Sequence, residues 1–388
     1  MKNLILFIFL TKNVIIKEKH KKEEDIMIKL EENNIYFYFN KSKLIENFNN
    51  FSVLGDVYYP LKTNTNGDVI KTLHSLMKKE ENGFLISSIY HFETLQRENI
   101  NPLKMCFINV LAEDDTVKYL YNNGVRFFTF DNLNSVINFS KYADLSKVKI
   151  AIRLSTTQVF NDKFTHLGGN LEECKEMLEF LRNKCNDYGI SFYIQNNLKT
   201  EDGALEKVLE YIQENYNDLG INFVSIGGLN ESKNISKEML EKFKNKLNIN
   251  QIILEVGRYL VEDTIEMETR IVREKTVENI KTVIIKNGIY SGFFDILLYN
   301  RKFPIYLKSK NDGDIKIEYT KSKVNDFEFY MCGGSSDSGD KIGLMYIDSK
   351  YKDELKIGAK FIVKGVGAYF EEFFMPYSND LKKVFIEV

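Results

Sequence analysis

From Asp56 onward, short apolar runs rich in β-branched and aromatic residues alternate with longer segments whose apolar residues recur at helical spacing. Strand composition is found in eight runs: DVYYPL (56–61), GFLISS (83–88), KMCFINV (104–110), GVRFFTF (124–130), KVKIAIRL (147–154), GISFYIQ (189–195), NFVSIGG (222–228) and QIILEVG (251–257). Amphipathic segments lie between them, such as VIKTLHSLMKKE (69–80), DDTVKYLYNNG (114–124) and ALEKVLEYIQENY (204–216). Because this alternation is typical of a parallel sheet with helical crossovers, it predicts an α/β fold, a (β/α)8 TIM-type barrel over residues 40–265.

Beyond residue 265, strand-like runs follow one another without long helices. These runs are TIEMETRIVREKT (264–276), KTVIIKNG (281–288), FPIYLKS (303–309), DIKIEYTKS (314–322), FEFYMCGG (327–334), GAKFIVKGVGAYF (358–370) and KVFIEV (383–388). We therefore expect a C-terminal antiparallel β-barrel or sandwich domain over residues 266–388. The early run IYFYF, within residues 27–39, is expected to add a first strand to that domain.

The first 26 residues superficially resemble a signal peptide, with LILFIFL followed by KEKHKKEED. The apolar run is short, the basic residues mainly follow it, and no small-residue cleavage site is present. We interpret residues 1–26 as a non-native or disordered leader, with Met27 as the biological start.

Composition narrows the class of protein. The chain has 388 residues, 44% hydrophobic and 28% charged, with a formal net charge of −2, so no whole-chain basic field favours nucleic acid or a membrane surface. The cysteines are scattered, without a CxxC pair or a histidine at ligand spacing, at Cys106, Cys174, Cys185 and Cys332. This pattern predicts neither a metal site nor a disulfide framework and favours a cytoplasmic protein.

Several strand ends carry residues suited to chemistry. Lys62 directly follows the first barrel strand, where it either caps the strand in water or, if partly desolvated, is an amine nucleophile. Gly227 and Gly228 end the seventh strand, where backbone N–H groups could approach an anion. Glu255 ends the eighth strand, and Arg258 follows one turn later as a cation suited to phosphate.

The order of motifs resembles the fold-type III pyridoxal-phosphate (PLP) decarboxylases of the ornithine, arginine and diaminopimelate group, across residues 35–388. The matching pieces are YYPLKTN, IRLSTTQVFNDKFTHLGG, SIGGLN, EVGRYL, NGIYSGFFDILLYN, CGGSSDSGD and GVGAY. The resemblance implies a PLP-dependent amino-acid decarboxylase (a carboxy-lyase) that works through an internal aldimine on Lys62 and a quinonoid intermediate.

The resemblance also assigns cofactor-binding roles. Glu255 falls on the carboxylate that keeps the pyridine nitrogen protonated, which lets the ring take up the electron pair released with carbon dioxide. Arg153 matches the arginine near the lysine and the cofactor. The positions that bind phosphate in relatives are Gly227, Gly228, Arg258 and Tyr369.

In CGGSSDSGD, the resemblance implies a loop that enters the neighbouring subunit's active site, and therefore a homodimer with shared sites. Asp337 would lie near the substrate's distal amine, and Ser336 stands where many relatives have a cysteine that reprotonates the carbanion. A hydroxyl is a far weaker acid than a thiol with a pKa of about 8.5. Tyr299 and Asn300 occupy substrate-binding positions.

Other positions depart from the family pattern. Tyr193 replaces a histidine that stacks on the cofactor ring, and Asn196 replaces a serine at the phosphate. Asn300 replaces an acid that binds the far end of a diamine. The remaining departures are Leu85 for an acid, Leu229 for glycine and Val256 for proline. Because these changes surround the cofactor and the substrate tail, we expect altered specificity, with a modified or conjugated amino acid of polyamine or siderophore metabolism as substrate.

Two alternatives remain open. An amino-acid racemase of the alanine racemase kind shares the barrel and the lysine, but usually has arginine at the pyridine nitrogen, so Glu255 favours decarboxylation. A catalytically silent homologue that binds and regulates partner subunits is the other alternative. Retention of Lys62, Glu255 and Arg258 counts against it.

Overall fold

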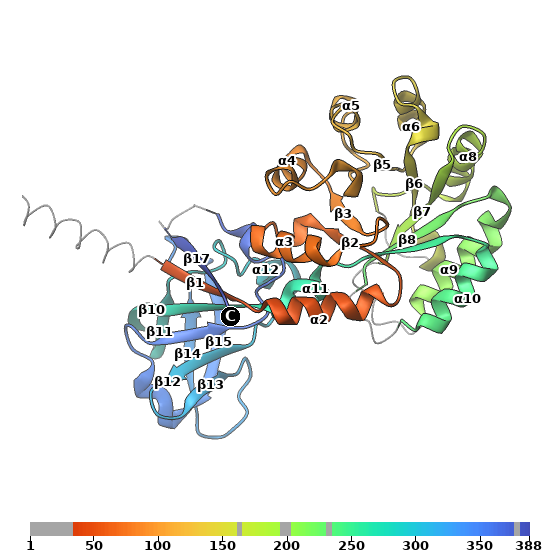
Figure 1. Ribbon diagram of the computed structural model, residues 1–388. Helices are drawn as coiled ribbons and strands as arrows, with labels where there is room; N and C mark the ends of the chain where they lie inside the picture. Colours follow the sequence, from red (N-terminus) through yellow and green to blue (C-terminus); the bar gives the residue numbers. More distant parts are fainter. Residues whose placement is uncertain (1–33, 161–164, 195–202, 230–234, 376–380) are drawn as a thin grey trace, which may run out of the picture. The chain divides into compact units, whose positions relative to one another are not determined.

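The computed structural model describes residues 34–160, 165–194, 203–229, 235–375 and 381–388. The expected leader and Asn196 therefore lie outside the described residues. The chain forms two compact units (Figure 1). The barrel unit contains Asn40–Thr264 and Gly367–Glu372, and the β unit contains the flanking segments, including Ile265–Val366. The sequence boundaries had placed the Gly367–Glu372 segment with the β unit.

The eight predicted barrel strands are confirmed, and they close into a ring of parallel neighbours. Closure comes from pairing of the first strand with the last, where Asp56 faces Ile253 and Tyr58 faces Glu255. The strands are β2 (Asp56–Pro60), β3 (Gly83–Ile86), β4 (Met105–Phe107), β5 (Phe127–Phe130), β6 (Lys149–Leu154), β7 (Asp187–Tyr193), β8 (Phe223–Gly227) and β9 (Gln251–Glu255).

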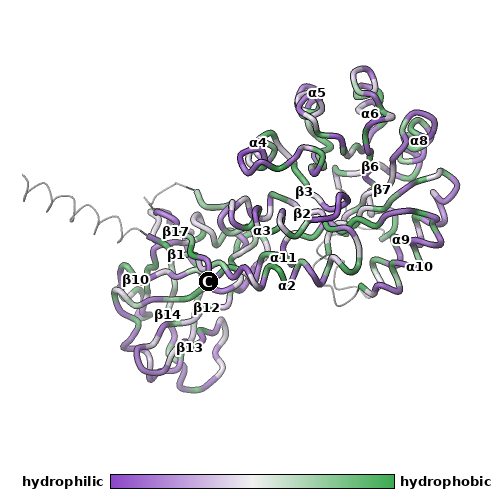
Figure 2. The backbone as a smooth tube through the Cα atoms, in the orientation of Figure 1, coloured by the Kyte–Doolittle hydropathy of each residue, from purple (hydrophilic) through white to green (hydrophobic). Residues whose placement is uncertain are grey.

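Helices lie outside the strands of the barrel unit (Figure 1). Their bounds are α2 (Lys41–Ser52), α3 (Gly67–Leu76), α4 (Ile89–Arg97), α5 (Asp114–Asn122), α6 (Leu133–Ser140), α7 (Thr157–Phe160), α8 (Leu171–Leu181), α9 (Ala204–Tyr216), α10 (Lys237–Leu247) and α11 (Arg258–Val261). Helix α9 buries Leu205, Val208 and Ile212, which share one face because of their three- and four-residue spacing. Figure 2 shows both hydrophobic and hydrophilic residues along these helices.

Aromatic side chains fill the interior of the barrel. The ring of Tyr58 lies edge-on to Phe127 at 5.8 Å between centroids, and Phe127 lies edge-on to Phe223 at 5.5 Å. Gly189 makes room for this cluster, because a Cβ there would stand 2.8 Å from Cγ of Phe223. The filled interior leaves the C-terminal strand ends as the place for a site.

The β unit contains a nine-stranded sheet with the order β13-β12-β16-β10-β11-β14-β15, with β1 paired to β10 and β17. Most pairs are antiparallel, as expected, whereas β1 with β17 and β11 with β14 are parallel. The strands are β1 (Asn34–Phe39), β10 (Ile265–Val277), β11 (Ile280–Ile285), β12 (Ile305–Ser309), β13 (Gly313–Ile317), β14 (Asp326–Cys332), β15 (Lys341–Asp348), β16 (Lys360–Val363) and β17 (Lys382–Glu387). The sequence patterns had not indicated β15. Helix α12 (Asp295–Tyr299) belongs to the same unit.

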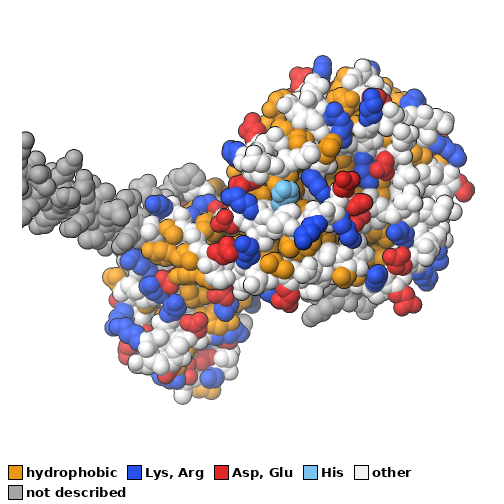
Figure 3. Space-filling view, viewed as in Figure 1, with side chains coloured by type: hydrophobic (Ala, Val, Ile, Leu, Met, Phe, Trp, Pro, Cys, Tyr) orange, Lys and Arg blue, Asp and Glu red, His pale blue; other side chains and the backbone are white. Residues whose placement is uncertain are grey.

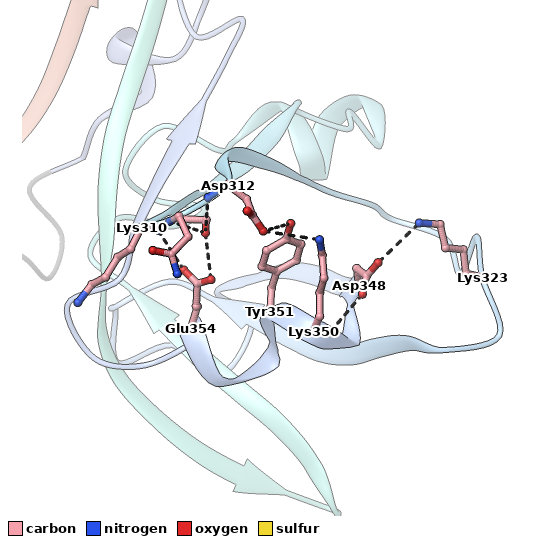
Figure 4. A network of polar contacts seen from close by, with 9 residues as sticks. Lys310, Asp312, Lys323, Asp348, Lys350, Tyr351 and Glu354 are labelled. Carbon is pink, nitrogen blue, oxygen red and sulfur yellow. Dashed lines mark hydrogen bonds and ion pairs between the residues drawn. The ribbon is translucent and has the colours of Figure 1, made fainter.

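A polar network fastens the turns at one end of the β unit (Figure 4). Asp312 accepts a hydrogen bond of 2.8 Å from the Tyr351 hydroxyl and pairs with Lys350 at 3.6 Å. Glu354 accepts from the Ser309 hydroxyl at 3.0 Å. These contacts tie the short helix η7 (Ser349–Glu354) to the β12–β13 hairpin.

Candidate active site

Lys62 lies at the C-terminal edge of the barrel, in the single-turn helix η1 (Leu61–Thr63) that directly follows β2. Pro60 ends the strand in an extended conformation, with φ −69° and ψ 107°, and the chain turns in the η1 helix that follows. Leu61 and Thr63 are buried on either side, whereas Lys62 keeps an exposed surface while the barrel around its amine still desolvates it. Burial of its neighbours fixes where the lysine stands.

Two charged side chains of the barrel act on the Lys62 amine. Desolvation by the surrounding barrel lowers the pKa of Lys62; the negative charge of Glu255 opposes this shift, and the positive charge of Arg153 adds to it. The barrel thus brings together Arg153 from β6, Glu255 from β9 and Lys62 from the turn after β2. A lysine with a lowered pKa supplies a neutral amine more readily, which favours the nucleophile interpretation over a surface cap.

The Glu255 carboxylate is largely shielded from solvent. Ser225 on β8 donates a hydrogen bond of 2.7 Å from its hydroxyl to Oε1 of Glu255. Desolvation raises the pKa of Glu255, while the Ser225 hydrogen bond and the charges of Arg153 and Lys62 lower it. An acid in this environment can hold or share a proton with a basic group placed against it.

His91, in the first turn of α4, is another titratable group near Lys62. Its Nδ1 accepts a hydrogen bond of 3.2 Å from the Ser87 backbone N–H, which puts the proton of the neutral ring on Nε2. Burial lowers the pKa of His91, and the charge of Lys62 lowers it further. Leu85, which departs from the family pattern in the sequence, is buried in the barrel core.

Gly227 ends β8 and Gly228 follows it, so no side chain projects there, as the anion-site interpretation requires. A Cβ on Gly227 would lie 3.1 Å from Oε2 of Glu255 and 3.1 Å from Cδ2 of Tyr193. Gly228 has φ +85°, and a Cβ there would collide with the carbonyl oxygen of Ile194. The glycine pair therefore leaves space beside Glu255, with the ring of Tyr193 next to it. The Tyr193 side chain is 39% exposed and available for stacking.

Arg258 and Tyr369 come together although they are far apart in the sequence. The guanidinium carbon of Arg258 lies 4.9 Å from the centroid of the Tyr369 ring. Arg258 also pairs with Glu262 at 3.0 Å, which fixes the base of α11. Tyr369 has φ +58°, and its backbone N–H donates to the Thr63 carbonyl oxygen at 2.8 Å. Of the predicted phosphate residues, Tyr369 thus contacts both Arg258 and the turn that carries Lys62.

Ser336 and Asp337 lie in the β unit, on the exposed part of the loop between β14 and β15. The buried Asp340 holds the base of this loop by accepting from the N–H groups of Ile289 at 2.6 Å and Ser335 at 3.1 Å. Asp337 accepts from the Tyr290 hydroxyl at 3.0 Å. The loop therefore has an ordered base and presents both predicted residues at its surface.

Tyr299 and Asn300 also belong to the β unit, at the end of α12. Tyr299 is 58% exposed, and Asn300 ends the helix in the left-handed region with φ +50°. Arg301 donates to the Gly365 carbonyl oxygen at 3.0 Å and lies 3.6 Å from the buried Asp295. These contacts fix the chain directly after Asn300.

Sequence analysis missed two polar residues of the site, Ser225 and His91. Ser225 precedes Gly227 by two positions, so strand alternation directs it to the same side of β8, and this was the available signal. His91 had no comparable signal, because its nearness to Lys62 depends on how α4 follows β3 in three dimensions.

Three further observations concern surface charge, metal binding and membrane spans. Figure 3 shows Lys and Arg interspersed with Asp and Glu on the visible face. Within the described ranges, no group of three histidine, cysteine, aspartate or glutamate residues could hold a metal ion. Nor does the described part of the chain contain a helix long and apolar enough to cross a bilayer.

Known decarboxylases resemble this chain in both sequence and fold. The lysine/ornithine decarboxylase of Selenomonas ruminantium is 23% identical over 332 residues, covering 81% of this chain and 78% of that protein. The fold matches the agmatine-bound arginine decarboxylase of Paramecium bursaria Chlorella virus with a TM-score of 0.75 and 16% identity, over 94% of this chain and 100% of that one. SrLDC in complex with PLP and cadaverine matches with a TM-score of 0.73 and 20% identity, over 91% and 90% of the two chains.

Residues 41–262 match the family model described as the pyridoxal-binding domain of pyridoxal-dependent decarboxylases. This stretch is more than half of the chain and covers every barrel strand together with Lys62, Glu255 and Arg258. The predicted cofactor and reaction class are confirmed with it. The chain belongs to the pyridoxal-dependent decarboxylases, enzymes that use PLP to remove a carboxyl group from amino acids.

Proposed function

We propose that this enzyme decarboxylates a basic amino acid or a conjugate of one, with Lys62 as the residue that binds PLP covalently. One observation carries the proposal. The Lys62 amine lies at the C-terminal edge of a closed barrel, where desolvation and the Arg153 cation lower its pKa and the Glu255 carboxylate raises it. Such an edge is where barrels of this kind place their chemistry.

The residues present fit the cofactor. Gly227 and Gly228 leave a cradle that a Cβ would fill, next to a carboxylate and an aromatic ring. Arg258 and Tyr369 supply a cation and a hydroxyl suited to a phosphate group. Glu255 supplies a carboxylate for the pyridine nitrogen, and Tyr193 supplies a face for stacking on the ring. Asn196, assigned to the phosphate by resemblance, lies outside the described residues.

When bound, PLP supplies an electron sink for the pair of electrons released as carbon dioxide leaves. Lys62 would hold the cofactor through its side-chain amine, whose lowered pKa favours the neutral form. Glu255 would hold a proton at the pyridine nitrogen, and Ser225 orients that carboxylate through its hydrogen bond. Arg153 lowers the pKa of Lys62 and so favours the neutral amine.

The substrate class follows from the relatives and from one departure. The relatives act on lysine, ornithine or arginine according to their names, and solved structures contain cadaverine, putrescine or agmatine. Asn300 offers an amide where relatives offer an acid to the distal amine. An amide suits a modified or conjugated side chain, as found in polyamine or siderophore metabolism, better than a second ammonium group.

We further propose a cytoplasmic homodimer in which the loop with Ser336 and Asp337 completes the partner's site. Asp337 would contact the distal group of the substrate, with Tyr299 and Asn300 near it, and Ser336 would deliver a proton to the α-carbon of the product. Their exposure on an anchored loop supports this placement.

The test combines three measurements on purified protein with added PLP. Borohydride reduction and peptide mapping would locate the cofactor on Lys62. Carbon dioxide release would be compared for lysine, ornithine, arginine and their side-chain conjugates, and chiral analysis would detect racemisation. We expect cofactor on Lys62 and fastest release from a conjugate. Racemised substrate without carbon dioxide would favour the racemase alternative, and absence of bound cofactor would contradict both enzyme interpretations.

A further inference from the structure

The turn that carries Lys62 is held by a strap from a remote part of the chain. We define the Lys62 turn as residues 62–66 and the strap as Gly367–Glu372, and both belong to the barrel unit. Asn64 donates from its side-chain amide to the Gly367 carbonyl oxygen at 2.9 Å. The Tyr369 N–H donates to the Thr63 carbonyl oxygen at 2.8 Å. The strap therefore contacts the turn through both backbone and side chains.

Glu372, at the end of the strap, makes several hydrogen bonds to a single residue of the turn, Thr65. Its Oε1 accepts a hydrogen bond of 2.6 Å from the Thr65 backbone N–H and another of 3.0 Å from the Thr65 hydroxyl. Its Oε2 lies 3.2 Å from the same hydroxyl. Hydrogen bonds to an ionised carboxylate are stronger than those between neutral groups, and a bidentate arrangement also fixes direction. Glu372 therefore clamps Thr65, three residues after Lys62.

The remaining polar groups of the turn reinforce this clamp. The Tyr59 hydroxyl donates to the Asn64 carbonyl oxygen at 3.1 Å, and the Asn66 N–H donates to Oδ1 of Asn64 at 2.8 Å. Thr63 and Asn64 are buried, so the turn cannot exchange these partners freely for water. A shift of Thr65 would therefore be transmitted to the residues that precede it.

The strap also connects the two ends of the proposed cofactor site. Tyr369 contacts Arg258, a proposed phosphate residue, and its hydroxyl accepts from the Thr63 hydroxyl at 3.4 Å. Glu372 lies in the same strap, three residues later. One short segment thus touches both the phosphate end and the turn that bears the amine.

We propose that Glu372 is a positioning residue of the reaction, which fixes the Lys62 turn through Thr65 and keeps the amine at a set distance from the phosphate end. This inference rests on the proposed function, because it assigns a purpose to the position of Lys62. Glu372 acts through Thr65 and is not itself assigned a contact with substrate. The strap carries this residue because its chain returns to the barrel after leaving the β unit.

The test compares Glu372→Ala, Glu372→Gln and Thr65→Ala with the wild type. Glu241→Gln, which changes an exposed carboxylate on the outer helix α10, is the matched control. Hydrogen exchange of the peptide covering residues 62–66 would be measured without cofactor, alongside the thermal midpoint. The rate at which PLP becomes reducible onto Lys62 would be measured separately.

We expect Glu372→Ala to accelerate exchange at the Lys62 turn and to slow cofactor attachment, each by about tenfold or more, as expected for loss of hydrogen bonds to a charged group. Glu372→Gln should recover part of both effects, because the amide oxygen keeps an acceptor. Thr65→Ala should give a smaller effect, since the backbone hydrogen bond remains. The control should match the wild type.

The inference would be overturned if Glu372→Ala showed the same hydrogen-exchange rate at the Lys62 turn and the same rate of PLP attachment as the wild type. Faster exchange spread equally over α10 and the Lys62 turn would also overturn it, because that would show a general loss of stability. If Glu372→Ala does not fold, Glu372→Gln and Thr65→Ala decide by the same two readouts. Wild-type protein that never attaches PLP at Lys62 would overturn the proposed function, whereas the exchange data would still decide whether Glu372 holds the turn.

Discussion

Ser225 donates a hydrogen bond of 2.7 Å to Oε1 of Glu255, and this contact joins neighbouring barrel strands at the centre of the proposed site. Desolvation raises the pKa of Glu255, and the Ser225 hydroxyl counteracts that shift by bonding to the charged form. The hydroxyl therefore extends the pH range in which Glu255 is ionised.

Replacing Ser225 with alanine should raise the pKa of Glu255 further, because the hydrogen bond that lowers it is lost. In the proposed role of Glu255 the carboxylate is ionised when it pairs with the pyridine nitrogen, so the acid limb of the pH profile of kcat/KM should move to higher pH. Ser225→Thr keeps a hydroxyl and should stay near the wild-type profile. An unmoved acid limb in Ser225→Ala would show that this hydrogen bond does not tune Glu255.

Lys62→Ala should abolish turnover and covalent PLP attachment without unfolding the protein, because it removes the amine and leaves the buried neighbours of η1 in place. Activity assays, borohydride trapping and the thermal midpoint would check this. Lys71→Ala is the matched control, since Lys71 is exposed on α3 and pairs with Glu98 at 3.4 Å. Retained activity in Lys62→Ala would refute the assignment.

Glu255→Gln should lower the pKa of Lys62 further in the cofactor-free protein, because the Glu255 charge raises that pKa in the wild type. The sign follows from the protonated amine losing its nearby counter-charge. Reaction of Lys62 with an amine reagent, followed by mass mapping, should therefore begin at lower pH in the variant. Decarboxylation should fall strongly in the same protein, whereas a racemase would be little affected. Reaction at unchanged or higher pH would contradict the described electrostatics.

Arg258→Ala should chiefly weaken PLP binding, by roughly 1.5 to 3 kcal/mol, because it deletes the proposed charge-assisted phosphate contact. Equilibrium titration of the cofactor-free protein would measure the loss. Arg97→Ala on α4 is a suitable control, since Arg97 hydrogen-bonds to the Thr94 hydroxyl at 2.8 Å. Equal cofactor affinity in Arg258→Ala and wild type would place the phosphate elsewhere.

Mixing Lys62→Ala protein with Asp337→Ala protein should restore activity if two subunits share each site. One of the two composite sites in a mixed dimer carries both intact residues, so random exchange gives about a quarter of wild-type sites, from the arithmetic of a two-fold interface. Each variant alone should be nearly inactive. A mixture as inactive as its parents, with subunit exchange verified by mass, would exclude a loop shared between subunits.

The sequence determined the barrel because its evidence is local. Strand-like runs alternating with amphipathic segments such as residues 204–216 must bury their apolar faces, and a ring of parallel strands does so. Lys62 could be singled out for the same reason, since strand ends of such a fold meet at one edge. Strand β15 escaped the pattern because its buried residues, Ile342, Met345 and Ile347, are not spaced in strict alternation.

The tertiary structure alone decided which remote residues meet Lys62. Glu372 contacts Thr65 across more than 300 positions of sequence, and no local pattern connects them. His91 acts on the same site because α4 begins beside the end of β3. Likewise, the lowered pKa of Lys62 depends on desolvation and on charges from other strands. Periodicity records which face of an element is buried, whereas hydrogen bonds and electrostatic fields depend on distances that exist only after the elements have packed.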